Sequence, residues 1–279
     1  MRWRDQRQSS NVEDRRGFSG RNIAIGGGGL GTLVIIVLAL LCGQDPRTLL
    51  QQMPVDTDVQ TQSQRAPQND DVKQFVASVL GSTEDAWSEI FQRNGSRYRQ
   101  PKLVLYSDAV RSACGTSSSS VGPFYCPGDE QLYLDTAFFR ELRDEFKAPG
   151  DFAEAYVIAH EVGHHVQNLL GTMGKVSEAQ SRGSRTQANQ YSVRLELQAD
   201  CYAGIWAKYA QGRGLIETGD IEEALRAASE VGDDQIQKRA QGYVIPDSFT
   251  HGSARDRMTW FSQGFKTGDL RQCNTFGGK

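Results

Sequence analysis

The run His160-Glu161-Val162-Gly163-His164-His165 contains three of the four histidines in this chain of 279 residues. It lies within residues 151–170, a stretch without proline that is rich in Phe, Ala, Val, Ile and Leu and is followed by Gly171. This composition predicts one largely buried helix that ends at the glycine. Because residues four apart share one face of a helix, His160 and His164 are placed to hold one metal ion together. The fold must therefore bury a helix that carries ionisable side chains.

The spacing H-E-x-x-H is typical of zinc peptidases, in which two histidines bind Zn²⁺ and the glutamate acts as general base. Glu161 is rotated one step from His160, which places its carboxylate beside the metal instead of on it. His165 points about 100° away from His164, so we expect it to pack or to support the site and not to bind the metal. The alternative is that the histidines fall at this spacing by chance.

A continuation of the same motif does not supply the third metal ligand. In metzincins the motif extends to a glycine and a third histidine, but this chain has Gln167 and Leu170 at those positions. A second predicted helix, residues 186–211, carries Glu196 and Asp200 four residues apart among apolar side chains. Glu196 is the candidate third ligand, and Asp200 could accept a hydrogen bond from a metal-binding histidine. The alternative is a pair of solvated carboxylates on that helix.

The motifs H-E-V-G-H and E-L-Q-A-D resemble the metal site of gluzincins, in which an E-x-x-x-D helix supplies the third ligand and its orienting aspartate. The segment Thr250-His251-Gly252-Ser253, together with Arg257, resembles the T-H-P-S segment of membrane gluzincins related to the CAAX prenyl endopeptidases. Over nearly its whole length, from the opening M-R-W-R onward, the chain is similar to the bacterial family described as "putative neutral zinc metallopeptidase".

This resemblance implies roles for two residues outside the metal-binding motifs. His251 would donate a hydrogen bond to the oxyanion of the tetrahedral intermediate, a contribution on the order of 100-fold to 1,000-fold in rate. Arg257 would steady the site or its glutamate. Gly252 stands where the related segment has proline, which predicts a looser turn around His251. The alternatives are a surface histidine and a structural arginine.

An apolar stretch near the amino terminus predicts attachment to the bacterial inner membrane. Residues 23–42 carry no charge and are long enough, at about 1.5 Å per residue, to cross a bilayer of about 30 Å. Six arginines and three acidic residues precede them, so the positive-inside rule places the amino terminus in the cytoplasm and the catalytic part on the periplasmic or extracellular side. A cleavable signal peptide is the alternative.

The chain is accordingly divided into four parts. We expect a cytoplasmic basic tail (1–22), a single transmembrane anchor (23–43), a flexible tether (44–70) and a zinc metallopeptidase domain (71–279). The tether is rich in Gln and Asp and lacks apolar periodicity, which predicts flexibility.

The cysteines are compatible with export of the domain. Apart from Cys42 in the apolar stretch, four remain, an even number that allows two disulfides in an oxidising compartment. The short segment between Cys114 and Cys126, rich in Ser and Gly, favours a local disulfide and leaves Cys201 to pair with Cys273. The second bond would tie the helix of the third ligand to the carboxyl-terminal tail. Reduced, buried cysteines are the alternative.

The domain is predicted to be α+β and predominantly helical, a zincin-like metallopeptidase fold with a small β-sheet. Further helices are expected at residues 71–93, 220–241 and 253–265, and strands at 102–106 and 131–135. The second strand would either form an edge that aligns an extended peptide by strand addition or be an ordinary paired strand. Residues 171–190 are polar, and we expect a loop or lid, or ordinary surface, there.

Two classes of function are compatible with these patterns. The leading one is a membrane-anchored endopeptidase with one Zn²⁺ per chain that acts on extracytoplasmic proteins or peptides, and an amidase of cell-wall peptide is a narrower enzymatic alternative. The other is a non-hydrolytic, zinc-stabilised protein-binding module of the cell envelope, although a structural zinc site has no need for Glu161. The net charge of −3 argues against a nucleic-acid-binding surface.

Overall fold

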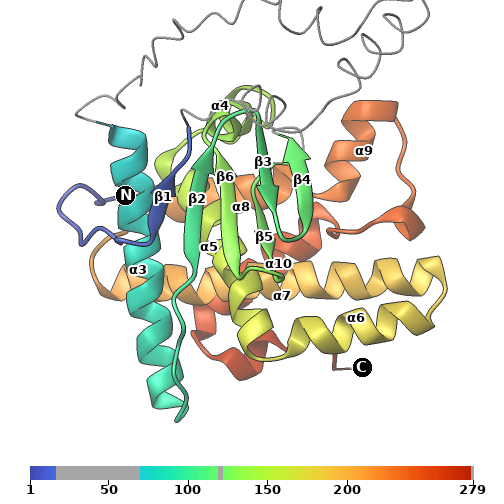
Figure 1. Cartoon of the computed structure of the whole chain (residues 1–279). Helices are drawn as coiled ribbons and strands as arrows, with labels where there is room; N and C mark the ends of the chain where they lie inside the picture. Colours follow the sequence, from blue (N-terminus) through green and yellow to red (C-terminus); the bar gives the residue numbers. More distant parts are fainter. Residues whose placement is uncertain (17–69, 119–121, 278–279) are drawn as a thin grey trace, which may run out of the picture.

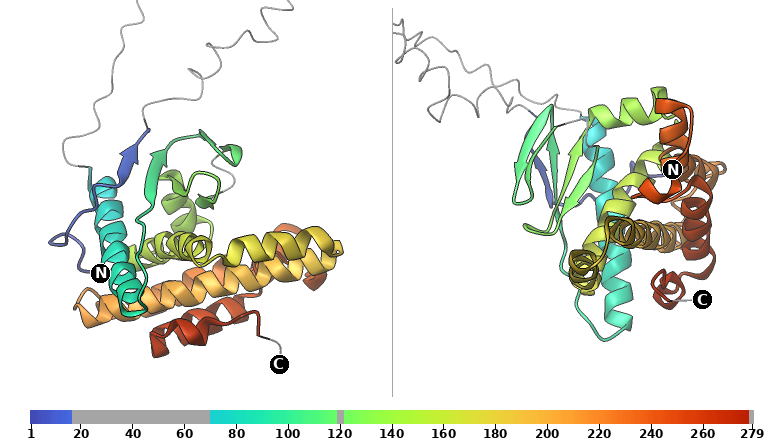
Figure 2. Two further views of the ribbon diagram at one scale, coloured as in Figure 1. Left: turned by 60° about the horizontal axis from the view of Figure 1, so that its bottom comes forward. Right: turned by 90° about the vertical axis from the view of Figure 1, so that its right-hand side faces the viewer.

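The computed structural model describes residues 1–16, 70–118 and 122–277. Within these, a small sheet lies against one side of a body of helices (Figures 1 and 2), so the class is α+β and mostly helical, as the sequence predicts. In these three ranges no helix combines the length and the apolar character needed to cross a bilayer. The predicted anchor at 23–43 lies outside the described residues, as does the predicted tether apart from its last residue.

The sheet has the strand order β1-β2-β6-β5. β2 pairs in parallel with both β1 and β6, and β5 runs antiparallel to β6. Since β6 is paired along both sides, the expectation that it forms a free edge is wrong, and the alternative of an ordinary paired strand is correct. The four strands are β1 (Val12–Asp14), β2 (Lys102–Tyr106), β6 (Gln131–Asp135) and β5 (Phe124–Cys126).

A separate hairpin joins β3 (Ala109–Ser112) to β4 (Gly115–Ser118). The disulfide Cys114–Cys126 connects the turn of this hairpin to β5. The second disulfide joins Cys201 to Cys273, so the cysteines form the two pairs that the sequence favours.

Residues 1–16 are packed on the rest of the domain. β1 extends the sheet, and Trp3 is only 7% exposed, with its ring edge-on to that of Phe75. The buried carboxylate of Glu84 accepts hydrogen bonds from Ser9 at 2.6 Å and from Asn11 at 2.7 Å. Both Phe75 and Glu84 belong to α3 (Asp71–Arg93). The predicted separation of a tail from a domain that starts at residue 71 therefore needs correction, because residues 1–16 supply a strand and core side chains to that domain.

Three helices carry the candidate site. α5 (Asp151–Leu169) matches the predicted helix at 151–170 and is buried over most of its length. α7 (Arg185–Gly212) crosses it, and α10 (Ala254–Thr267) lies along α7, as the left view of Figure 2 shows. The crossing of α5 and α7 is close at Gly163, where a Cβ atom would lie 3.0 Å from the carbonyl oxygen of Ala199. This contact brings the H-E-V-G-H segment against the helix of Glu196.

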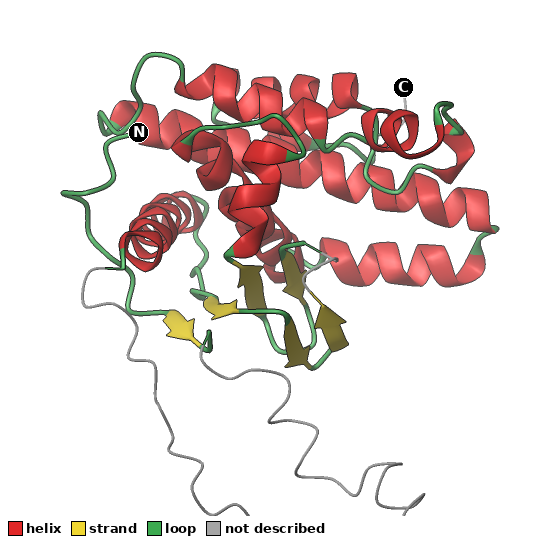
Figure 3. Ribbon diagram, turned by 90° about the horizontal axis from the view of Figure 1, so that it is seen from above, coloured by secondary structure: helices red, strands yellow, loops and turns green. Residues whose placement is uncertain are grey.

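Residues 171–190 do not form the expected loop. They contain α6 (Thr172–Arg182), which packs on α7, and the start of α7, where Ser184 and Gln187 form a capping box. The loop prediction is wrong because a helix that lies on the surface needs few apolar residues, and Val176 is the buried residue of α6. In Figure 3 the strands lie on one side of the body of helices.

The predicted helix at 220–241 is two helices, α8 (Asp220–Glu230) and α9 (Asp233–Gln241). The chain breaks at Gly232, where a Cβ atom would lie 2.5 Å from the backbone nitrogen of Ala254, so a residue with a side chain would not fit this contact with the start of α10. The remaining elements are α4 (Ala137–Asp144) and the short 3₁₀ turns η3 (Pro246–Ser248) and η4 (Leu270–Cys273).

Candidate metal centre

His160 and His164 lie one turn apart on α5, and both direct Nε2 at the carboxylate of Glu196 on α7. The distances are 3.1 Å from His160 to Oε2 and 3.3 Å from His164 to Oε1. Donor atoms about 2.0–2.1 Å from a tetrahedral zinc ion lie about 3.3 Å from one another, so this spacing fits zinc. The structure thus brings together the three ligands expected from the sequence.

The second nitrogen of each histidine faces a buried acceptor. Nδ1 of His160 lies 2.9 Å from Oδ1 of Asp200, which is fully buried. Nδ1 of His164 lies 2.9 Å from Oε1 of Gln167. A neutral histidine that donates from Nδ1 keeps the lone pair of Nε2 free, which is the form that binds a metal.

Arg257 on α10 supports Asp200. Its guanidinium donates from Nε to Oδ2 at 2.8 Å and from Nη2 to Oδ1 at 3.0 Å. The Tyr156 hydroxyl also donates to Asp200 and accepts from Arg257 at 3.2 Å. Arg257 therefore acts on the carboxylate that orients His160, and it compensates the charge of a carboxylate that would otherwise be costly to bury.

The electrostatics of the three ligands favour a cation between them. Burial lowers the pKa of His160, but the carboxylates of Asp200 and Glu196 outweigh burial and raise this pKa to about 10. Burial raises the pKa of Glu196, but His164 and His160 hold it well below its ordinary range. The site thus retains ionised carboxylates in a buried position, where a cation is stabilised strongly.

Glu161 and His165 occupy other faces of α5. Glu161 is partly buried, and burial raises the pKa of its carboxyl although the neighbouring histidines act in the opposite direction. His165 is fully buried, with Nδ1 3.1 Å from the Tyr125 hydroxyl and Nε2 2.7 Å from the carbonyl of Arg99. His165 thus contacts β5 and the segment before β2, as a packing residue would.

His251 lies on a turn whose backbone N–H groups donate hydrogen bonds to the carboxylate of Asp233. Oδ2 of Asp233 accepts the backbone N–H groups of Thr250, His251 and Gly252, at 2.8, 2.6 and 2.8 Å. Oδ1 lies 3.3 Å from Nδ1 of His251, whose side chain is 54% exposed. The hydrogen bond that His251 donates to Asp233 raises the pKa of His251 despite partial burial, and the charge of Glu196 adds to this effect.

Gly252 has a φ of 98°, which proline cannot adopt, and a Cβ atom there would lie 3.2 Å from Leu197 on α7. The glycine thus lets the turn lie against the helix of Glu196. In place of a proline, the three backbone hydrogen bonds that Asp233 accepts hold this turn.

Three residues of the site were not identified in the sequence. Tyr156 and Gln167 could have been found from helical spacing, since they stand four residues before His160 and three after His164. Asp233 could not have been found, because the predicted continuous helix at 220–241 hides the break that presents its carboxylate to the turn of His251.

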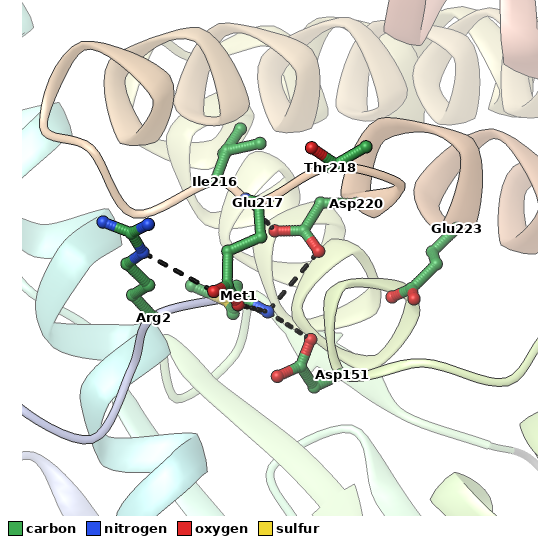
Figure 4. A pocket seen from close by; sticks show the side chains of 8 residues that line it. All are labelled: Met1, Arg2, Asp151, Ile216, Glu217, Thr218, Asp220 and Glu223. Atoms are coloured by element: carbon green, nitrogen blue, oxygen red, sulfur yellow. Dashed lines mark hydrogen bonds and ion pairs between the residues drawn. The ribbon is translucent and has the colours of Figure 1, made fainter.

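A second group of carboxylates lies away from this centre. Asp151, Asp220 and Glu223 line a polar cavity of about 710 Å³ (Figure 4). The terminal ammonium group of Met1 lies between two of them, 2.6 Å from Asp151 and 3.4 Å from Asp220. Asp151 precedes His160 by nine residues, about 14 Å along α5, so this cavity is separate from the candidate metal centre.

A family model described as "putative neutral zinc metallopeptidase" matches residues 1–276. The chain belongs to this family. It is 47% identical over 285 residues, 99% of each chain, to the uncharacterized protein YpfJ of Escherichia coli K12. It is 43% identical over 257 residues, 85% of each chain, to the uncharacterized protein Rv2575 of Mycobacterium tuberculosis H37Rv. No solved structure matches the chain.

Proposed function

We propose that this protein is a zinc-dependent metalloendopeptidase that hydrolyses peptide bonds in proteins or peptides. The observation that carries the proposal is the convergence of His160 and His164 on Glu196 at spacings that fit zinc. The family description supports the same metal and the same class of reaction. Glu161 favours hydrolysis over a purely structural role, because holding the ion requires no carboxylate at that position.

Each residue around the centre would have its own role in hydrolysis. Bound zinc would lower the pKa of a water to about 7 and polarise the scissile carbonyl. Glu161 would take the proton of the attacking water and deliver it to the leaving amine. His251, oriented by Asp233, would donate a hydrogen bond to the oxyanion. Asp200 holds His160 with Nε2 toward the centre.

The proposal is tested by incubating the full chain with an unstructured protein and identifying the products by mass spectrometry. We expect internal cleavage that stops when a zinc chelator is added and returns when zinc is restored. Bound zinc without cleavage of any protein or peptide would instead favour the non-hydrolytic binding module.

We also propose that residues 1–16 and the domain occupy the same extracytoplasmic compartment, which a single crossing of the membrane by residues 23–43 would not allow. The two disulfides favour an oxidising environment. The pairing of β1 with β2 and the burial of Trp3 favour a position of residues 1–16 on the same side of a membrane as the domain. This replaces the expected arrangement in which residues 1–22 stay in the cytoplasm.

A labelling experiment tests this placement. Ser10 and Lys175 are both exposed, and each is changed to Cys in a chain that also carries Cys42→Ser. We expect a thiol reagent that does not cross membranes to label both variants in cells with a permeable outer layer and an intact inner membrane. Labelling of Lys175→Cys with protection of Ser10→Cys would contradict the shared compartment.

A further inference from the structure

A line of buried side-chain amides begins at His164. Gln167, whose Oε1 faces Nδ1 of His164, donates from Nε2 to the carbonyl of Leu195 at 2.6 Å and to Oε1 of Gln198 at 3.2 Å. Gln198 donates from its own Nε2 to the backbone carbonyl of Cys273 at 2.9 Å. Gln167 is fully buried and Gln198 nearly so, so water does not compete for these hydrogen bonds.

The backbone carbonyls fix the direction of every hydrogen bond in this line. A carbonyl oxygen can only accept, so Gln198 must present its NH₂ group to Cys273 and its oxygen to Gln167. Gln167 must then present its NH₂ group to Leu195 and Gln198, which leaves its oxygen for His164. If the amide of Gln167 were flipped, oxygen would face oxygen at two buried contacts. His164 therefore donates from Nδ1 to Gln167, which leaves Nε2, the nitrogen that faces Glu196, available for a metal ion.

We propose that Gln167 is a positioning residue for the metal centre, and that Gln198 and the carbonyl of Cys273 fix its orientation. The inference rests on the proposed zinc site, since the tautomer of His164 matters there only if Nε2 binds the ion. The two histidines are thus held differently, His160 by the carboxylate of Asp200 and His164 by a neutral amide. The amide orients the ring without adding a further buried negative charge to the site.

The disulfide Cys201–Cys273 holds the far end of this line. Cys201 follows Gln198 by three residues on α7, so the covalent bond and the hydrogen bond of Gln198 join the same turn of α7 to η4. Both cysteines are fully buried. The disulfide therefore keeps the Cys273 carbonyl, which accepts from Gln198, in place. Loss of the disulfide should loosen the orientation of Gln167.

The test compares zinc affinity, measured on the full chain by competition with a chromogenic chelator, with thermal unfolding of the metal-free protein. Gln167→Met keeps the size of the side chain but removes the acceptor, and we expect the Kd for zinc to rise about 10- to 100-fold. Gln167→Glu keeps an acceptor for His164 but turns oxygens toward Leu195 and Gln198. It should therefore bind zinc nearly as tightly as the wild type while unfolding at a lower temperature.

Gln180→Met is the matched control. The amide of Gln180 donates to the carbonyl of Ala188 and the hydroxyl of Ser192, away from both histidines, so its loss should leave the Kd unchanged.

The disulfides supply a second comparison. Changing Cys201 and Cys273 together to Ser should raise the Kd less than Gln167→Met does, whereas changing Cys114 and Cys126 should not raise it.

Three results would overturn the positioning role. The first is a Gln167→Met protein with the zinc affinity of the wild type. The second is a Kd for zinc that rises in each Gln167 variant in proportion to the fall in its unfolding temperature. The third is an unchanged Kd for zinc when Cys201 and Cys273 are replaced. A wild-type chain that binds no zinc would instead overturn the metal centre itself, so the two failures are distinguishable.

Discussion

Changing Glu161 to Gln is expected to lower the rate of peptide hydrolysis on the order of 100- to 10,000-fold while zinc stays bound. The amide has nearly the same shape as the carboxylate but cannot accept the proton of the attacking water. The ligands His160, His164 and Glu196 are untouched, so the metal content should remain that of the wild type. Initial rates on a fluorogenic peptide, with bound zinc measured on the same samples, provide the check.

Glu178→Gln is the control for this experiment. Glu178 is exposed on α6 and pairs with Arg182, so the same chemical change there should alter neither the rate nor the zinc content. A Glu161→Gln protein that still hydrolyses peptide at the wild-type rate with zinc bound would remove Glu161 from the mechanism.

Changing Trp3 to Ala is expected to lower the free energy of unfolding by about 3–5 kcal/mol. The ring is buried against Phe75 of α3, and its loss leaves a cavity between residues 1–16 and the domain. Urea unfolding of the full chain measures the change. Asp5→Ala serves as the control, because Asp5 is exposed in the same segment, so it should change stability by less than about 1 kcal/mol.

The same reasoning predicts that a fragment starting at residue 71 folds poorly. Without residues 1–16 the sheet loses β1, and Glu84 loses the hydrogen bonds from Ser9 and Asn11 in a position that is 1% exposed. If the Trp3→Ala protein unfolds within about 1 kcal/mol of the wild type, residues 1–16 contribute little to the fold, and the shared compartment proposed for them loses its support.

The features that could be predicted from the sequence are those that local periodicity determines. The helix at 71–93 has the predicted bounds, and the spacing within α5 and α7 places His160, His164, Glu196 and Asp200 correctly on their helices. Whether two such helices cross with these faces together is not a local property. That outcome depends here on contacts such as that of Gly163 with Ala199, which a motif does not specify.

The features that could not be predicted depend on contacts between distant segments. β1 has three residues, too few for an alternating pattern, and its basic neighbours suggested a tail instead of an edge of the sheet. The break at Gly232 lies where the chain packs closely on the start of α10, and the next residue, Asp233, contacts the turn of His251. The role of Gln167 depends on partners from α7 and the carboxyl-terminal segment.

The most direct test of the central claim is the zinc content of the purified full chain, determined together with its hydrolytic activity, in the wild type and in a Glu196→Ala variant. We expect one zinc per wild-type chain and hydrolysis that a chelator abolishes, with both strongly reduced in the variant. Hydrolysis by a wild-type protein that binds no zinc, or a Glu196→Ala protein that keeps its full zinc content and activity, would contradict the assignment of this centre.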